Sequence, residues 1–421
     1  MHVNRSLILA CLVSVVVVAL SGQVFSATVA VGNCTALVNY ATIQQAVNAV
    51  PAGSTIKVCP GNYREQVVIG QKVTLSGIVY ANQDLAIILP PTTGLAANAV
   101  SVDSGNPIAA QIFVQNTVGP VVINNLTVDG SGNGIGGCSP NLMGILFQNA
   151  SGTLKHVAVR NETLSAGLEG CQSGQAIFVQ SASGSTSTVL VESSSVHKYN
   201  KNGITGNDIG TTLTVTGNYV QGSGVVPLPG AAQNGIQMGF GATGKMSGNT
   251  VIDNIYSDPT VAASADILLF DTATNSGITI TGNTLGNSQL PIALFADDGS
   301  GDGVFVTNNK IAGTSTYDGI DICTNGNTVE TNTIFNSAES GVHLDASCGS
   351  SGNNNTVSGN TILESACAGI LADSGTTGNT TTPNVYYTVP FQLTSSTSTC
   401  TIPGQAGQSR ANRGSTISPA R

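Results

Sequence analysis

The sequence predicts an all-β fold, a parallel β-helix in which short strands stack coil upon coil. One short pattern recurs between about Leu213 and Asp373, and each copy places an Asn between a polar pair and an aliphatic residue. A second short apolar strand follows each copy. Apolar and polar residues alternate with a period of two and form no helical stripe, so the units are strands. Repeats spaced by roughly 20–40 residues cannot bury an apolar face alone and must stack on one another.

The recurrent Asn predicts a ladder of side chains inside a turn of the solenoid. Each amide could bond the equivalent amide or backbone group one coil away, at about 4.8 Å. This interpretation is structural rather than functional. The ladder positions are Asn218, Asn249, Asn283, Asn309, Asn332 and Asn360. Nearer the N-terminus the same position holds Leu126, Val157 and Ser194, so we expect the ladder to be incomplete there.

Composition limits the class of protein. The chain has 421 residues, and no change of composition divides it into two globular domains. Only 8% of the residues are charged, with a net charge of −9, whereas 41% are hydrophobic. The hydrophobic content and the β-branched strands favour a folded chain over a disordered one. An acidic chain without a basic stripe is not expected to bind nucleic acid.

The first 26 residues are typical of a secretory signal peptide. Arg5 precedes an apolar run from Leu7 to Leu20, and small residues follow, with cleavage expected after Ser26 or Ala27. An uncleaved membrane anchor is the alternative, although the run is short for a span. We therefore expect a secreted, extracellular or periplasmic protein with no membrane span after signal cleavage. We also expect a monomer.

The remaining chain divides into three parts. Residues 27–375 are expected to form the β-helix, with a capping helix at about 42–50 that covers the exposed first coil. Thr42 is a plausible N-cap for this helix, and Pro51 follows its end. The repeat pattern stops after Asp373, so residues 376–402 are expected to lie over the open C-terminal end. Residues 403–421 are rich in Gly, Ser, Pro and Arg and are expected to form a disordered tail.

Eight of the nine cysteines remain once Cys11 leaves with the signal peptide. An even number of cysteines in an exported chain implies disulfides, and no CxxC pair or Cys/His cluster favours a metal site. Their placement on equivalent or adjacent coils predicts sequential pairing. The predicted pairs are Cys34–Cys59, Cys138–Cys171, Cys323–Cys348 and Cys367–Cys400.

The segment from Ala41 to Gly77 carries the most specific resemblance in the chain. Its TIQQAV and PGNYREQVVI stretches resemble the start of pectin esterases and related secreted β-helix proteins. The coils as a whole resemble the pectate-lyase-like superfamily, which includes pectate lyases, polygalacturonases and alginate epimerases. This resemblance implies a right-handed parallel β-helix. It assigns no activity, because fold does not imply function.

Alignment of the second strands at their first aliphatic residue predicts where chemistry could lie. One inward column is expected at Ile145, Ile177, Ile204, Ile236, Ile267, Ile292, Ile320, Val342 and Ile370. The outward columns then stack Asp321 beside His343, and Asp345 beside Asp373. Stacked carboxylates either share a proton or bind a cation, and a carboxylate pair with a His can serve acid–base chemistry.

We interpret Asp321, His343 and Asp345 as candidate catalytic residues. Asp345 and Asp373 are the candidate ligands of a cation, with Ca²⁺ as the possible ion and no cofactor otherwise expected. The alternative is a solvated sheet face that carries a few charges, with His343 as a surface or loop-contacting residue. Asp297, Asp298 and Asp302 are expected at or just after the strand one coil earlier.

The catalytic motifs of the resembling families are absent from the sequence. Asp297-Asp298 offers the DD of polygalacturonases without their NTD or GHG, and Asp258-Pro259 is only part of the DPHD of alginate epimerases.

Two classes of function therefore remain. The first is a polysaccharide-binding or polysaccharide-cleaving protein, lyase-like or hydrolase-like, with an acidic glycan possible. The second is a non-catalytic, adhesin-like structural protein. Aromatic residues are scarce, at 5%, although Phe178, Phe270 and Phe295 lie on the outward columns.

Overall fold

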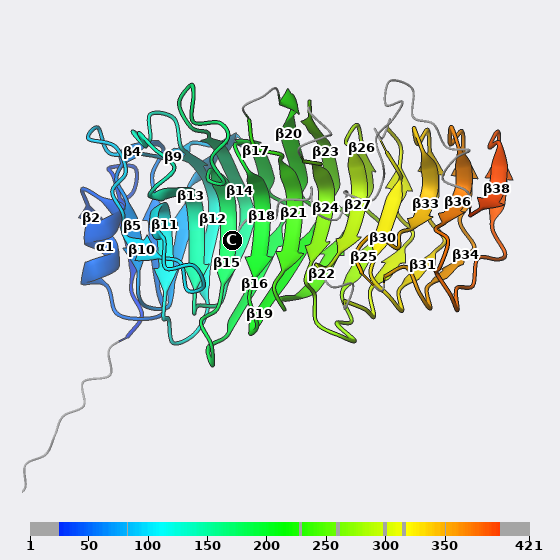
Figure 1. Cartoon of the computed structure of the whole chain (residues 1–421). Helices are drawn as coiled ribbons and strands as arrows, with labels where there is room; N and C mark the ends of the chain where they lie inside the picture. Colours follow the sequence, from blue (N-terminus) through cyan, green and yellow to red (C-terminus); the bar gives the residue numbers. More distant parts are fainter. Residues whose placement is uncertain are drawn as a thin grey trace, which may run out of the picture.

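The chain winds as a right-handed parallel β-helix, seen here in a computed structural model. Its coils follow one another along a single axis, from α1 at one end to β38 at the other (Figure 1). The described residues form one 23-stranded sheet and one 13-stranded sheet, with a short two-stranded hairpin beside them. The structure describes residues 25–81, 83–226, 230–257, 262–297, 301–313, 317–349 and 351–395.

A central coil shows how the sequence pattern becomes structure. Strands β19 (Thr211–Thr216) and β20 (Tyr219–Val226) flank the Asn turn and belong to the larger sheet. Strand β21 (Asn234–Gly239) lies in the smaller sheet. Each pairs in parallel with its counterpart in the next coil, β22 (Thr243–Ser247), β23 (Thr250–Tyr256) and β24 (Ala265–Phe270). The repeat in the sequence is therefore one coil.

The predicted inward column of the smaller sheet is confirmed. Its members pair in register from Ile145 and Ile177 through to Val342 and Ile370. All of them are fully buried in the main hydrophobic core. Because side chains alternate along a strand, this register also fixes which residues point outward.

The N-terminal cap forms as predicted. Helix α1 (Ile43–Ala49) begins after Thr42, whose hydroxyl oxygen accepts a hydrogen bond from Gln45 N at 3.1 Å. The carboxylate of Glu65 accepts two further bonds, from Ile43 N at 2.8 Å and Gln44 N at 2.9 Å. These contacts satisfy backbone donors that a helix leaves unpaired in its first turn. Buried residues of α1 then pack on the first coil, which includes β1 (Thr28–Val31) and β3 (Ser54–Val58).

The end of the repeat differs from the prediction. Parallel pairing continues past Asp373 for one more coil, in which β37 (Val385–Tyr387) pairs with β35 (Thr361–Leu363). Strand β38 (Phe391–Thr394) likewise pairs with β36 (Ala368–Ala372). The segment that follows Asp373 thus covers the C-terminal end as a coil of its own. Residues 403–421 lie outside the described residues.

The predicted Asn ladder is confirmed and is longer than expected. Each side-chain amide donates to the Oδ1 of the next Asn at 2.9–3.0 Å, from Asn218 through Asn360 and on to Asn384. The same Oδ1 atoms also accept backbone N–H bonds, for example Asn309 N to Asn332 Oδ1 at 2.9 Å. A second ladder joins Asn327 and Asn355, with Asn379 as its next member. Leu126 and Val157 are buried apolar residues at the equivalent position, as expected.

Three of the four predicted disulfides are present. Cys34–Cys59, Cys138–Cys171 and Cys323–Cys348 have Cα–Cα separations of 5.7, 5.2 and 5.6 Å. The fourth pair involves Cys400, which lies outside the described residues.

The predicted signal peptide also lies almost wholly outside the described residues. No helix within the described residues is long and apolar enough to cross a membrane.

Candidate functional site

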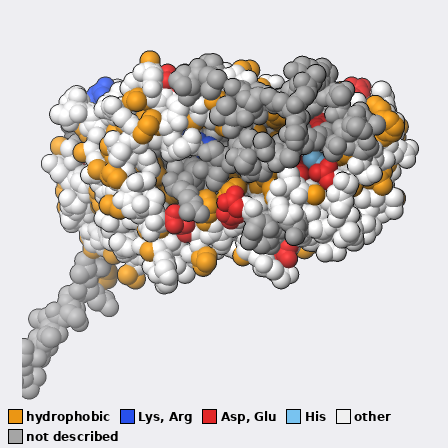
Figure 2. All heavy atoms as spheres, in the orientation of Figure 1, with side chains coloured by type: hydrophobic (Ala, Val, Ile, Leu, Met, Phe, Trp, Pro, Cys, Tyr) orange, Lys and Arg blue, Asp and Glu red, His pale blue; other side chains and the backbone are white. Residues whose placement is uncertain are grey.

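The structure brings the predicted site residues together at the C-terminal half of the smaller sheet. Asp321 on β30 (Ile320–Cys323) pairs in register with His343 on β33 (Ser340–Leu344). Asp345 directly follows β33, and Asp373 directly follows β36. Figure 2 shows acidic side chains beside a histidine toward this end of the molecule. The predicted stacking of Asp321 on His343 is confirmed.

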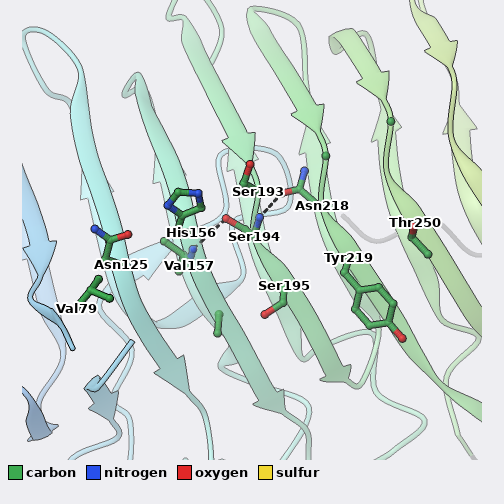
Figure 3. Close-up of a pocket in the computed structure, with 13 residues that line it drawn as sticks. Val79, Asn125, His156, Val157, Ser193, Ser194, Ser195, Asn218, Tyr219 and Thr250 are labelled. Atoms are coloured by element: carbon green, nitrogen blue, oxygen red, sulfur yellow. Dashed lines mark hydrogen bonds between the residues drawn. The ribbon is translucent and has the colours of Figure 1, made fainter. Parts of the chain in front are cut away.

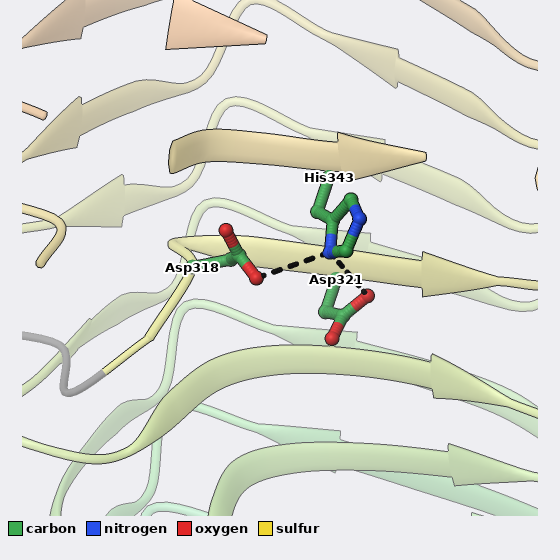
Figure 4. A group of neighbouring side chains, drawn as sticks. All are labelled: Asp318, Asp321 and His343. Atoms are coloured by element: carbon green, nitrogen blue, oxygen red, sulfur yellow. Dashed lines mark ion pairs between the residues drawn. The ribbon is translucent and has the colours of Figure 1, made fainter. Parts of the chain in front are cut away.

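A fifth residue, Asp318, completes what we call the His343 cluster: Asp318, Asp321, His343, Asp345 and Asp373. His343 Nδ1 lies 3.3 Å from Asp318 Oδ2 and 3.7 Å from Asp321 Oδ1 (Figure 4). On the other side of the ring, Nε2 lies 3.2 Å from Asp373 Oδ1. The ring contacts do not meet hydrogen-bond geometry, so we treat them as ion pairs. Carboxylates from three consecutive coils therefore surround one imidazole.

The cluster is buried, which corrects the alternative of a solvated sheet face. His343 is 1% exposed, Asp321 is fully buried and Asp345 is 2% exposed. Only Asp373, with 16% of its side chain exposed, connects the cluster to solvent. His343 is therefore not a surface residue. Buried charges are costly unless they are paired, so the carboxylates and the imidazole depend on one another.

The electrostatics of the cluster favour a charged imidazole. Burial alone would lower the pKa of His343, but the facing carboxylates of Asp318 and Asp345 hold it well above its usual value. Burial likewise acts to raise the pKa of Asp373, yet its contact with His343 lowers that pKa overall. The raised pKa favours the charged form of His343, and the contact with His343 favours the ionised form of Asp373.

Backbone and hydroxyl donors fix the carboxylates in place. Asp318 Oδ1 accepts bonds from the backbone N–H of Ser340, at 3.0 Å, and from the Ser340 hydroxyl. Asp345 Oδ1 accepts from Ser347 N at 2.7 Å, and Asp373 Oδ2 accepts from Ala346 N at 3.3 Å. These bonds orient the carboxylates around the ring, so the cluster is pre-organised.

Sequence analysis missed Asp318. It lies two residues before Ile320, next to a non-repetitive insertion, and so falls outside the aligned columns. The signal that could have found it is the register, because Ser340 occupies the equivalent position one coil later and binds the Asp318 carboxylate.

The neighbouring acidic residues do not join the cluster. Asp297 N donates to Asp271 and Asp302 accepts from Asn275, whereas Asp298 lies outside the described residues.

Two subsets of the cluster have ligand atoms close enough to share a cation. The subsets are Asp318, Asp321 and His343, and His343, Asp345 and Asp373, each with its atoms within 4.8 Å of one another. Both ring nitrogens of His343 already face carboxylates, and an imidazolium cannot ligate a metal. A cation would therefore be held mainly by oxygens, with Asp345 and Asp373 as the more accessible pair. Oxygen donors of this kind suit Ca²⁺.

The outward phenylalanines do not form an exposed platform for sugar rings, contrary to expectation. Phe270 and Phe295 are 4% and 1% exposed and pack with Tyr317 and the Cys323–Cys348 disulfide. Phe178 is 1% exposed and belongs to a separate apolar cluster. The apolar cluster around Phe295 adjoins the His343 cluster, because Ala293 pairs with Asp321 on the next strand. It supports the site from one side rather than offering a binding face.

Comparison with known proteins confirms the fold. No protein-family model and no curated protein sequence match this chain. The native crystal structure of GH136 lacto-N-biosidase from Eubacterium ramulus is similar, with a TM-score of 0.53 and 11% identity over 88% of this chain and 68% of that one. At such low identity the likeness establishes the fold alone.

Two further solved structures have lower scores. The mannuronan C-5 epimerase AlgE4 A-module of Azotobacter vinelandii has a TM-score of 0.45 and 14% identity over 84% of this chain and 92% of that one. DFA-IIIase from Arthrobacter chlorophenolicus A6, in complex with DFA-III, has a TM-score of 0.46 and 16% identity, covering 85% and 83% of the two chains.

Proposed function

We propose that this protein cleaves glycosidic bonds by hydrolysis and that the His343 cluster is its active site. The observation that carries the proposal is the buried ring of His343, held between carboxylates of the preceding and the following coil. Such a group of strongly interacting titratable residues is typical of catalytic sites. Glycoside hydrolysis needs two carboxyl groups, one protonated and one ionised.

The geometry supports a division of roles within the cluster. The ligand atoms of Asp345 and Asp373 lie within 4.8 Å of each other, and carboxylates this close resist ionising together. We assign the role of general acid to Asp345, whose carboxyl group lies beside Asp373 at the solvent-facing side of the cluster. Asp321 supplies the second carboxylate. His343 is a positioning residue that holds the carboxylates on either side of its ring.

The backbone spacing of the two residues to which we assign catalysis agrees with hydrolysis by inversion. Asp321 and Asp345 lie one coil and two residues apart, which separates their Cα atoms by roughly 8 Å. Inverting hydrolases need about 6.5–9.5 Å between their carboxyl groups to admit a water molecule. A lyase acting on an acidic glycan would need a cation beside the carboxylate of the substrate. His343 is the one basic side chain of the cluster, and its ring nitrogens already face Asp318 and Asp373. The cluster therefore fits hydrolysis better than a lyase reaction.

The neighbouring structures support carbohydrate as the class of substrate. The structure with the TM-score of 0.53 is named a lacto-N-biosidase. By analogy of fold alone, this likeness favours a carbohydrate as the substrate of the present protein. An exported location agrees with this role, since three disulfides are typical of an oxidising compartment. Substrate would approach the cluster from the side of Asp373, where the cluster meets solvent.

A non-catalytic structural role is the second candidate. Burial of Asp318, Asp321 and His343 favours it, because a buried ion-pair network can fix the geometry of the last coils without any ligand. In that role the protein would be an extracellular scaffold or adhesin whose stacked coils are the functional surface.

A glycan panel distinguishes the two candidates. Purified protein is assayed for reducing ends on neutral and acidic polysaccharides, with and without Ca²⁺. We expect cleavage of at least one glycan, and Asp321→Asn and Asp345→Asn should lower its rate by about 10²–10⁴-fold. Asp297→Asn, an exposed residue one coil earlier, is the matched control and should retain full activity. Absence of cleavage on every glycan, or equal rates in all variants, would favour the structural role.

A further inference from the structure

A concave surface lies on the larger sheet, whereas the His343 cluster lies on the smaller one. The larger sheet bends at the Asn turn, and a cavity of about 750 Å³ follows the outside of this bend. It crosses β12 (Val121–Asp129), β14 (Gly152–Glu162) and β17 (Ser195–Tyr199) before it reaches β20 and β23 (Figure 3). We call this cavity the elbow groove. Its volume falls within the range of small-molecule and saccharide sites.

The floor of the elbow groove is open and rigid. Each coil turns there on a residue with positive φ, and at Gly217 and Gly248 a Cβ atom would meet nothing within 4 Å. The backbone below is fixed by the end of the Asn ladder, where Ser194 N donates to Asn218 Oδ1 at 2.9 Å. A ligand can therefore approach the backbone closely without reorganising it.

An exposed aromatic ring stands beside this floor. Tyr219, the first residue of β20, is 41% exposed and pairs in register between Ser195 and Thr250. Figure 3 shows Ser195, Tyr219 and Thr250 on successive strands, with His156 and Asn125 on the strands that precede them. A tyrosine between hydroxyl-bearing neighbours presents an apolar face and polar donors together, which is what a pyranose ring requires.

Charge and backbone bonding exclude other classes of ligand. The lining residues include no Asp, Glu, Lys or Arg, and His156 is the one lining side chain that could carry a positive charge, so the groove offers little to balance a strongly charged ligand. A peptide would need free backbone groups for strand addition. The floor offers few, because Gly217 N and Gly248 N already donate to the next coil, at 3.0 and 3.1 Å. A neutral, hydroxyl-rich ligand fits this lining best.

We propose that the elbow groove binds an unbranched neutral oligosaccharide, with Tyr219 as the stacking platform. The groove spans five successive coils, which at about 4.8 Å per coil gives a length of roughly 19 Å, enough for several sugar units. The site is independent of the His343 cluster, since it lies on the other sheet. It would hold a polysaccharide chain on the protein without taking part in bond cleavage.

The experiment measures binding of neutral hexasaccharides built from glucose, xylose or mannose to the full chain by titration calorimetry. We expect at least one to bind, and Tyr219→Ala should weaken it about tenfold. Gly217→Asn should weaken it similarly by filling the floor, because Asn tolerates positive φ, as Asn125 does at the equivalent turn. Asp321→Asn should leave this binding unchanged.

Two matched controls separate binding from stability. Tyr387→Ala removes another exposed tyrosine of the same sheet, and Gly359→Asn makes the same change at an equivalent turn beyond the groove. Both should bind as the unaltered chain does. The proposal is overturned if no neutral hexasaccharide binds, or if Tyr219→Ala and Gly217→Asn bind as tightly as the controls. It is also overturned if Asp321→Asn alone abolishes binding, which would place the sugar at the His343 cluster.

Discussion

The Asn ladder and the His343 cluster are two stacks of buried polar side chains on neighbouring coils, but they satisfy burial in different ways. In the ladder each amide is neutral, donates to the next amide and accepts from the one before, so its polar atoms have partners one coil away. In the cluster four carboxylates share one imidazole, and most of its contacts are ion pairs. A satisfied neutral network rigidifies a core, whereas concentrated charge is costly.

This difference indicates which stack is structural and which is functional. Neutral amides repeat along the axis because every coil needs the same bond. Four carboxylates gather around one imidazole over β30, β33 and β36, and a stack of hydrophobic residues would serve stability there at least as well. Leu371, which pairs in register with His343, and Ala368 on the same strand β36 show that this face also accepts apolar residues.

The largest expected effect on stability is at Asp318. Asp318→Ala removes the carboxylate nearest to His343 Nδ1 and the acceptor of two Ser340 donors. Because it breaks a buried charge pair, we expect the free energy of unfolding to fall by about 3–5 kcal/mol. Urea denaturation followed by circular dichroism measures this loss. Asp297→Ala, at an exposed position, is the control, and an equal effect of both substitutions would contradict the pairing described here.

The ladder predicts a smaller but general loss. Asn309→Leu or Asn332→Leu leaves an amide and a backbone N–H of the preceding coil without their acceptor. We expect a loss of about 1–3 kcal/mol of stability in each variant. Asn48→Leu, on the exposed side of α1, should change little. Unchanged denaturation midpoints in both ladder variants would show that these amides contribute nothing.

Much of this comparison could be predicted from the sequence, and the reason is periodicity. The repeated aliphatic column fixed the register, and the register alone placed Asp321 against His343. Periodicity also located the ladder, but the predicted ladder ended too early. Asn379 and Asn384 belong to a last coil whose strands are short and largely exposed. Asp318 lies outside the repeated columns, and the repeat pattern carries no information on how deeply the outward face is buried, so neither could be predicted.

The pH dependence of stability sharpens the comparison further. The folded pKa of His343 is raised above its unfolded value of about 6.5, so its contribution to stability is complete below that pH and is lost as the pH rises through the folded pKa. The stability difference between the unaltered chain and His343→Gln should therefore be larger at pH 6 than at pH 10. Ladder variants should show the same difference at both pH values. Denaturation series at the two pH values test this, with His156→Gln as an exposed control.

The smallest expected effect is that of Ca²⁺. If Asp345 and Asp373 hold the ion, millimolar Ca²⁺ should raise the melting temperature by a few degrees, in proportion to the logarithm of its concentration. Asp345→Asn should abolish this shift, whereas Asn332→Leu should retain it from a lower starting temperature. Scanning calorimetry with and without a chelator measures both. A shift of equal size in Asp345→Asn would place the ion elsewhere.

One paired measurement tests the central claim that the His343 cluster carries function and the Asn ladder carries structure. The rate of glycan cleavage and the melting temperature are measured together for Asp321→Asn and Asn332→Leu. The account predicts that Asp321→Asn loses about 10²–10⁴-fold in rate, while Asn332→Leu, assayed below its melting temperature, keeps its rate and melts earlier. Retained cleavage in Asp321→Asn, or a comparable loss of rate in well-folded Asn332→Leu, would contradict it.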